Sequence, residues 1–313
     1  MSVRLAALAA VGTAVTACVA PQPPAPPSSA SVVAAARQLA PPASEWTGAC
    51  EDWDEWEKRA SPFRVHGNTY HVGTCGITAL LVAGPDGHVL IDTGTRNGSI
   101  IVLENIRLLG LRPENVTTVL TSHEHFDHVG GVWWVMQNTG ARVITSPVAA
   151  RVIESGSLDP LDPQNGVQPP MQAVEASLIT ALTPGQSIDL HGTRFTPLAT
   201  PGHTPGALTW QWESCDNGEC LTIVYADSLS PVSGDIYRFS DHPGYVQAYR
   251  DGLAELAALD CDILLTPHPS ASSMRGKLLE GDLTSGMDCA AYAADRLERL
   301  EIRLANEAQD ASQ

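Results

Sequence analysis

One stretch decides how this chain is interpreted: Thr121-Ser122-His123-Glu124-His125-Phe126-Asp127-His128-Val129-Gly130-Gly131. It follows the strand-like residues 116–120 and places three imidazoles and the Asp127 carboxylate within six residues. Zn²⁺ binds neutral imidazole nitrogens and carboxylate oxygens, and crowding such groups without a partner is costly. In a turn that leaves a strand, His123 and His125 point the same way and can share one ion. Asp127 and His128 can reach a second ion, so the spacing predicts two adjacent metal sites.

Two later loops carry histidines that fit the same plan. His203 lies in the Pro/Gly-rich segment 199–206, and His268 lies in segment 264–269, each just after a strand-like run. With the first cluster they make six ligands, enough for two ions with three protein ligands each. Three ligands leave a position open for water, which is typical of catalytic rather than structural zinc sites. The remaining histidines are interpreted as surface or packing residues: His66, His71, His88, His191 and His242.

The His-x-His-x-Asp-His pattern, followed by distant loop histidines, resembles the metallo-β-lactamase superfamily. Four further segments are similar to the class B, subclass 3 β-lactamases: residues 73–77, 88–94, 225–230 and 261–268. Within the last two, Ala-Asp-Ser-Leu-Ser and Leu-Leu-Thr-Pro-His are the most specific. The likeness runs from about Cys50 to the C-terminal helix. It implies an α/β chain with the four-layer αββα sandwich of the metallo-β-lactamase fold, in a catalytic domain spanning residues 45–313.

The resemblance also implies a function. It indicates zinc-dependent hydrolysis of the β-lactam ring amide of penicillins, cephalosporins and carbapenems, which gives antibiotic resistance. The implied ligands are His123, His125 and His203 for the first ion and Asp127, His128 and His268 for the second. Asp127 is further expected to orient the zinc-bound hydroxide. Ser228 and Ser230 are expected to bind the substrate carboxylate, directly or through water.

Asp227 keeps a second class of hydrolase open. Many relatives that do not act on β-lactams carry a bridging aspartate in this segment, and Asp227 could be that bridge if the register shifts by one residue. Such a site would belong to a di-zinc lactonase or thioesterase. A third interpretation is a zinc-binding lipoprotein without catalysis, which predicts zinc uptake and no turnover of a strained ring. The neighbouring Ser-Leu-Ser run favours the β-lactamase.

The composition narrows the class of partner. The chain has 313 residues, a net charge of −17 and 43% hydrophobic residues, which suits one large α/β domain with appendages. Nucleic-acid binding needs a basic face, so this acidity argues against the nucleases of the superfamily. We expect a monomer that acts on a small molecule, with an acidity that serves solubility.

The N-terminus indicates export. Residues 1–18 combine a basic start, an apolar run too short to span a bilayer and the sequence Val-Thr-Ala-Cys, which resembles the lipobox of bacterial lipoproteins. Lipidation of Cys18, followed by Val19 rather than Asp, would anchor the protein to the outer membrane in the periplasm. The alternative is ordinary cleavage near residues 17–20 and a soluble periplasmic protein. Residues 19–44 are rich in Pro, Ala and Ser, and we expect them to form a semi-extended tether.

Export permits disulfides, and six cysteines remain when Cys18 is set aside. Cys215 and Cys220 flank a short turn and can pair easily. Six cysteines allow fifteen connectivities, so sequence alone does not decide the pairing. Resemblance to the more disulfide-rich members of the subclass implies three bonds: Cys50–Cys75, Cys215–Cys220 and Cys261–Cys289. Because no cysteine has the spacing of a metal ligand, no cysteine–zinc site is predicted.

Apolar runs and turn signals predict the order of elements. Strands are expected at 63–65, 69–72, 78–83, 88–91, 116–120, 142–145, 187–190, 194–198, 207–212, 221–225 and 263–266. Helices are expected at 99–109, 130–138, 147–155 and 246–259, with a last helix from Cys289. Residues 156–170 have the composition of a loop. This periodicity alone indicates an α/β chain, and its two repeated halves fit the αββα sandwich that the resemblance implies.

Overall fold

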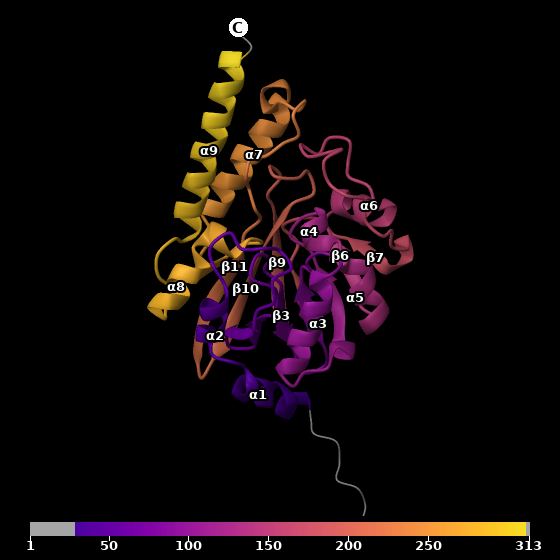
Figure 1. Ribbon diagram of the computed structural model, residues 1–313, viewed down its shortest axis with the longest axis vertical. Coiled ribbons are helices and arrows are strands. Elements are labelled where there is room, and N and C mark those ends of the chain that lie inside the picture. The colour runs from indigo at the N-terminus through magenta and orange to yellow at the C-terminus, as the bar shows by residue number, and fades with distance from the viewer. Residues whose placement is uncertain (1–28, 311–313) are drawn as a thin grey trace, which may run out of the picture.

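The computed structural model describes residues 29–310, which form four layers (Figure 1). Two β-sheets pack face to face, and helices cover the outer face of each sheet. Three buried apolar clusters fill the three spaces between successive layers. The expected α/β class and αββα sandwich are therefore confirmed.

The first sheet is built from the N-terminal half of the chain, in the strand order β1-β2-β3-β4-β5-β6-β7. Its first four strands pair antiparallel, and β4 to β7 pair parallel. Alternating side chains serve both faces, since Leu80 packs between the sheets while Leu81 packs under the helices. The strands are β1 (Phe63–His66), β2 (Thr69–His71), β3 (Leu80–Ala83), β4 (His88–Ile91), β5 (Val116–Leu120), β6 (Arg142–Thr145) and β7 (Ile179–Ala181).

The second sheet comes from the C-terminal half, in the order β12-β11-β10-β9-β8. Ile223 faces the first sheet, and its neighbour Val224 faces the helices on the outer side. Three large aromatic rings, those of Phe195, Trp210 and Trp212, fill the space between the sheets. The strands are β8 (Ile188–Leu190), β9 (Thr193–Ala199), β10 (Leu208–Asp216), β11 (Glu219–Tyr225) and β12 (Ile263–Leu265).

The helices form the two outer layers. In Figure 1, α3 and α5 cover the first sheet, while α7 and α9 lie side by side over the second. Within residues 29–310, no helix is long and apolar enough to cross a membrane. The α-helices are α1 (Ser29–Leu39), α2 (Ala43–Ala49), α3 (Gly98–Leu108), α4 (Phe126–Val129), α5 (Val132–Thr139), α6 (Pro147–Ser155), α7 (Pro243–Ala257), α8 (Met274–Glu280) and α9 (Cys289–Asp310). The 3₁₀-helices are η1 (Pro113–Asn115), η2 (Ala176–Leu178), η3 (Phe239–Asp241) and η4 (Pro269–Ser272).

The expected tether over residues 19–44 is wrong in its second part. Residues 29–39 form α1, and Ala36 is fully buried against the cluster between the first sheet and its helices. A run of good helix formers with a core surface to cover gains more by packing than by staying extended. Elements α2, α4, α8 and β7 were not predicted either. The expected signal peptide of residues 1–18 and its Cys18 lie outside the described residues.

The three expected disulfides are present. Cys50–Cys75 ties the end of α2 to the loop after β2, and Cys215–Cys220 closes the β10–β11 hairpin. Cys261–Cys289 ties the start of β12 to the start of α9. The first and third bonds therefore link segments 25 and 28 residues apart, whereas the second joins neighbouring strands only 5 residues apart.

Candidate metal centre

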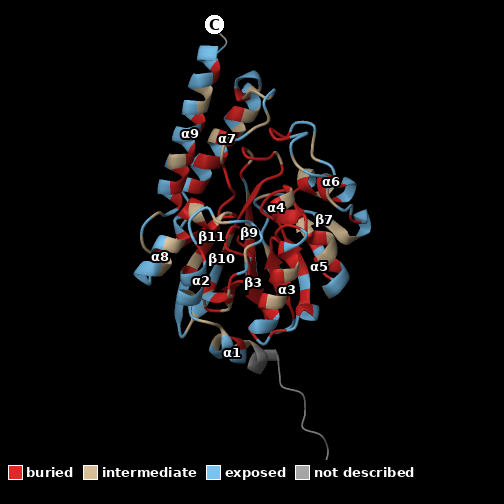
Figure 2. Ribbon diagram, viewed as in Figure 1, coloured by how far each residue is buried: buried red, intermediate tan, exposed pale blue. Residues whose placement is uncertain are grey.

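All six predicted ligands meet at one edge of the sandwich. His123 and His125 follow β5, and the chain then turns into the short helix α4, which carries Asp127 and His128. Loops after β9 and β12 bring in the remaining two histidines from the other sheet. Figure 2 shows the central loops around α4 as buried. This is unusual, because loops normally lie at the surface, where water satisfies their backbone groups.

The first ligand group consists of His123, His125 and His203. Their candidate ligand atoms all lie within 4.8 Å of one another, and His125 Nδ1 is 3.2 Å from His203 Nε2. All three side chains are buried. Burial, reinforced by the neighbouring imidazoles, lowers the pKa of His123 and His203 well below the usual value. These rings are therefore neutral and can offer lone pairs to a cation.

The second group is centred on Asp127. Its Oδ2 lies 3.1 Å from His128 Nε2 and 3.2 Å from His268 Nε2. Burial alone would raise the pKa of Asp127, but His128 and His268 outweigh it and bring that pKa well below its ordinary value. Conversely, burial opposes the charge on His128, while Asp127 raises the pKa of that histidine. The second group thus carries a carboxylate, the ligand type that the first group lacks.

Each of the five histidines has one ring nitrogen beside an oxygen acceptor on its outer side. His123 Nδ1 lies 2.8 Å from Asp227 Oδ1, His125 Nε2 3.2 Å from Asp162 Oδ2, His128 Nδ1 3.5 Å from Asp92 Oδ2, His203 Nδ1 2.9 Å from the Ser230 carbonyl and His268 Nδ1 3.2 Å from the Gly76 carbonyl. For His125, His203 and His268 the contact is a hydrogen bond, which holds the ring proton on the outer nitrogen and leaves the lone pair on the inner one. The contacts of His123 with Asp227 and of His128 with Asp92 lack hydrogen-bond geometry.

Whether a metal fits is tested by the inner ring nitrogens, those that face the other ligands. Among the described residues, Nε2 of His123 is buried and has no hydrogen-bond partner, and Nε2 of His128 is buried 3.1 Å from Asp127 Oδ2 without hydrogen-bond geometry. A buried polar atom without a partner is costly, so such atoms are rare unless something binds them. Neutral His123 and His203 beside the Asp127 carboxylate are donors that fit zinc, and a metal ion would displace the proton that Asp127 favours on His128. The six residues therefore fit two zinc ions.

Two carboxylates that hold ligands were missed by the sequence analysis. Asp92 is fully buried and accepts hydrogen bonds from Ser122 N (2.7 Å), Ser122 Oγ (2.6 Å) and Tyr225 OH (2.8 Å). Its backbone adopts a left-handed conformation, with φ of 59°, a strain typical of functional sites. Asp162 comes from the segment interpreted only as a loop. Nothing in its local sequence marks it, because its role depends on a ring that β5 positions.

Asp227 lies in neither ligand group and contacts His123 from behind. The backbone of this segment is held by Tyr292, whose hydroxyl donates to the carbonyls of Asp227 (3.0 Å) and Ser228 (2.6 Å). Ser228 Oγ is buried and has no partner among the described residues. Ser230 Oγ, in contrast, lies 3.2 Å from His203 Nδ1. Ser228 is thus free to bind a ligand, and Ser230 is already engaged.

Glu124 joins the two halves of the site. Its buried carboxylate accepts hydrogen bonds from Thr204 Oγ1 and Gly206 N, both at 2.8 Å, in the loop that carries His203. A Cβ on Gly206 would lie 2.7 Å from the carboxylate oxygens, so glycine is required there. Burial and the nearby Asp162 raise the pKa of Glu124 to about 7. The central residue of the His-x-His motif therefore fastens one ligand loop to the other.

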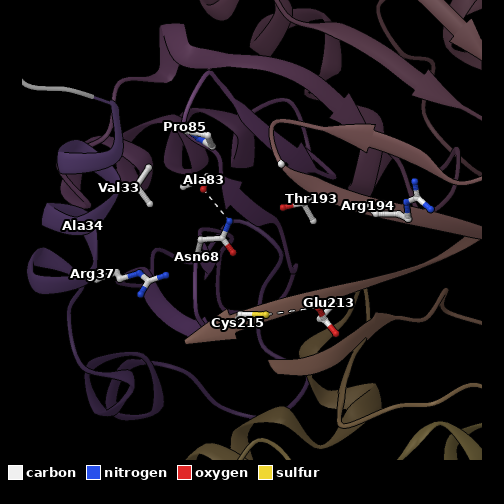
Figure 3. A pocket seen from close by; sticks show the side chains of 11 residues that line it. Val33, Ala34, Arg37, Asn68, Ala83, Pro85, Thr193, Arg194, Glu213 and Cys215 are labelled. Carbon is white, nitrogen blue, oxygen red and sulfur yellow. Dashed lines mark hydrogen bonds between the residues drawn. The ribbon is translucent and has the colours of Figure 1, made fainter. Parts of the chain in front are cut away.

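A cavity of 580 Å³ lies away from the six ligands, between α1 and strands β9 and β10 (Figure 3). Its charged groups have ordinary partners, since Arg37 pairs with Asp216 (2.8 Å) and Arg194 with Asp189 (2.9 Å). Cys215 also lines it, but the sulfur is in a disulfide and cannot ligate a metal. The reactive groups gather at the histidine edge and not in this cavity.

The chain is similar to known proteins over most of its length. A family model described as the metallo-beta-lactamase superfamily matches residues 72–216. The MIM-2 metallo-β-lactamase is 51% identical, with a TM-score of 0.78 over 85% of this chain and 98% of that chain. MEM-A1, a subclass B3 metallo-β-lactamase from a soil metagenome library, is 37% identical, with a TM-score of 0.77 over 82% of this chain and 100% of that chain.

Part of the chain is also similar to a hydrolase with another name. The hydroxyacylglutathione hydrolase of Acidiphilium cryptum (strain JF-5) is 34% identical over 147 residues, which cover 47% of this chain. The match spans 47% of that hydrolase, so about half of its length has no counterpart in the alignment.

Proposed function

Because the chain belongs to the metallo-β-lactamase superfamily of hydrolases, we propose that it opens the β-lactam ring of penicillins, cephalosporins and carbapenems. We further propose that it does so with two zinc ions per chain, held by the two ligand groups. The similarity to MIM-2 and MEM-A1 along almost the whole of those chains supports this substrate class.

One observation carries the proposal. Buried histidine nitrogens without partners lie at the same edge as the unpartnered hydroxyl of Ser228. Fused-ring β-lactams present an anionic carboxylate beside the amide that is cleaved. A neutral hydroxyl can donate to that carboxylate without adding charge to a strongly acidic protein. A site for metals and a site for the substrate carboxylate are thus adjacent.

When bound, zinc lowers the pKa of a coordinated water toward about 7 and polarises a carbonyl oxygen. The residues of the chain supply position. Asp127 offers a ligand atom within 4.8 Å of those of His123 and His128, which places its carboxylate where it can orient the attacking water. Asp162 accepts from His125 and fixes its tautomer, while Asp92 and Asp227 place carboxylates beside His128 and His123. No serine or lysine nucleophile is needed in this scheme.

A thioesterase or lactonase activity is the second candidate. The partial sequence match to a protein named as a hydroxyacylglutathione hydrolase favours it. This second activity was predicted on the basis of Asp227 as a bridging ligand, but the Asp227 carboxylate lies in neither ligand group. The geometry supports the β-lactamase better.

The decisive experiment compares five substrates: a penicillin, a cephalosporin, a carbapenem, a homoserine lactone and a glutathione thioester. We expect hydrolysis of the three β-lactams, loss of activity with a chelator and recovery on adding zinc. Metal analysis of protein purified without chelator should give close to two zinc ions per chain. Turnover of the lactone or thioester alone would replace this proposal with the second candidate. Firm binding of one zinc, unchanged by excess metal, would contradict the two-ion scheme.

We also propose that the protein is a periplasmic, monomeric lipoprotein anchored through Cys18. Incorporation of labelled palmitate that disappears in Cys18→Ser would support the anchor. Release of the wild-type protein in the soluble periplasmic fraction would favour ordinary cleavage instead. Sedimentation of the domain shows whether it is monomeric.

A further inference from the structure

Two exposed tryptophans stand beside the ligand His268. Trp53 and Trp56 have 69% and 44% of their surface exposed, yet their ring centroids lie 6.4 and 6.1 Å from that of His268. Large aromatic side chains are usually buried because their transfer from water is favourable. A pair left open next to a catalytic ligand marks a surface that is covered when something binds.

The tryptophans line a cavity of 500 Å³ that adjoins the metal centre. Phe126 also lines this cavity, and it stands between the ligands His125 and Asp127 in the sequence. Thr95 and the segment 53–57 complete the lining. A substituent of a substrate held at the metal centre would therefore meet aromatic side chains.

This aromatic segment is held rigidly in place. Trp53 N donates to Ser270 Oγ (2.7 Å), and Trp53 has a φ of 57°, a conformation uncommon for a bulky residue. The Trp56 carbonyl accepts from Thr74 Oγ1 (2.7 Å). A Cβ on Gly76 would lie 2.4 Å from the Asp54 carbonyl, so the segment packs directly on the residue whose own carbonyl holds His268. The two rings are thus preorganised, which reduces the entropy lost on binding.

The charge of the cavity wall indicates what it accepts. Asp54 is paired with Lys58 (2.7 Å), and Glu57 accepts hydrogen bonds from Thr95 and Asn97. Glu55 is exposed, and no basic side chain among the described residues lies within ion-pair distance of it. Tryptophan faces attract cations, quaternary ammonium groups above all, and a nearby carboxylate adds to that attraction.

We propose that Trp53, Trp56 and Glu55 form a subsite that favours β-lactams carrying a cationic substituent, in particular a quaternary ammonium group. The subsite rests on the proposed β-lactamase function, because it acts on the same substrate. It contributes specificity rather than chemistry, since none of the three residues belongs to either ligand group.

The test uses two cephalosporins that differ only in the substituent next to the ring, one with a quaternary ammonium group and one with a neutral acetoxy group. Wild type should show the lower KM for the cationic compound. Trp53→Leu and Trp56→Leu should each raise KM for the cationic compound by about two- to fivefold, the range of an exposed cation–π contact. Glu55→Gln should act in the same direction. KM for the neutral compound and zinc content should stay unchanged.

Glu219→Gln is the matched control, because Glu219 is an exposed glutamate in the distant β10–β11 hairpin. Equal changes in KM for both cephalosporins, or none, would overturn the subsite while leaving β-lactamase activity intact. If wild type hydrolyses neither compound, the proposed function fails, and the subsite is then tested separately by measuring the binding of small cationic and neutral probes. Saturation-transfer NMR with benzyltrimethylammonium and neutral benzyl alcohol should then show selective contact with the cation, lost in Trp53→Leu. Equal signals from both probes would reject the subsite.

Discussion

The two halves of the molecule contribute to the metal centre in different ways. The first half places four ligands within six residues, at the end of β5 and in α4. The second half contributes only His203 and His268, each alone on its own loop after a separate strand. The first set is organised by local backbone geometry, whereas the second set needs both sheets to be docked.

The supporting contacts of His203 and His268 show what that difference means. His203 is oriented by the Ser230 carbonyl, within its own half. His268 is oriented by the Gly76 carbonyl, which belongs to the opposite half. A ligand held across the interface between the sheets depends on the tertiary structure, so it should be the first to loosen when that interface is weakened. The following predictions test this comparison.

The largest effect is expected when one ligand is removed from each half. Asp127→Ala and His203→Ala should each lower β-lactam turnover by more than about a hundredfold, beyond the range typical of residues that only support ligands. Each variant should also hold fewer than two zinc ions, measured by metal analysis of the purified protein. His191→Ala, which removes a histidine outside the cluster, is the control and should retain full activity. Wild-type rates in either ligand variant would show that the ligands are misassigned.

Removing one disulfide near the interface between the sheets and one far from it tests whether that interface holds His268. Replacing Cys50 and Cys75 with serine opens a link of 25 residues next to Gly76 and should cost about 3.5 kcal/mol of unfolding free energy. Zinc affinity should fall as well, because the Gly76 carbonyl orients His268. Replacing Cys215 and Cys220, 5 residues apart, should cost only about 2 kcal/mol and leave zinc affinity unchanged. Denaturant titrations give the first quantity and chelator competition the second, and equal zinc loss in both variants would contradict the comparison.

The outer carboxylates test how much the ligands of the first half depend on support beyond their local backbone. Asp162→Asn and Asp92→Asn should each weaken zinc binding by about 10- to 100-fold, because the amide no longer holds the histidine in one tautomer. Both residues support histidines of the first half, so β-lactam turnover at saturating zinc should recover in part. Competition with a chromophoric chelator measures the affinity. An unchanged affinity in Asp162→Asn would mean that local backbone alone positions His125.

The smallest effect is expected for the serines of the second half. Ser228→Ala should raise KM for a carbapenem by the equivalent of about 0.5–1.5 kcal/mol, since it removes one hydrogen bond to the substrate carboxylate. Ser230→Ala should do less, because its hydroxyl already contacts His203. Zinc content should remain unchanged in both variants and in the double variant. Loss of zinc from the double variant would instead assign this segment to metal binding.

Much of the site could be read from local patterns. His123, His125, Asp127 and His128 are recognisable together because their spacing after a strand is itself a geometric constraint. His203 and His268 were found because each follows a strand-like run in a loop rich in Pro or Gly. The sequence resemblance also implied the three disulfides, which spacing alone left open among many pairings.

Long-range contacts were beyond such patterns. Asp162 and the Gly76 carbonyl support histidines that lie far from them in the chain, and no periodicity links such residues. The same applies to α1, whose sequence is compatible with a tether until a core surface is present for Ala36. Trp53 and Trp56 likewise read as ordinary apolar residues until the fold sets them beside His268.

The sequence by itself therefore determined which chemical groups are available and which half of the ligand set is preassembled, because both follow from residue type and local spacing. Only the tertiary structure decided which nitrogen of each histidine faces inward, since that depends on acceptors from other loops. It also decided that Asp227 stands behind a ligand rather than between two ions. The physical reason is that a lone pair is oriented by the partner of the opposite ring nitrogen, and that partner is chosen by packing.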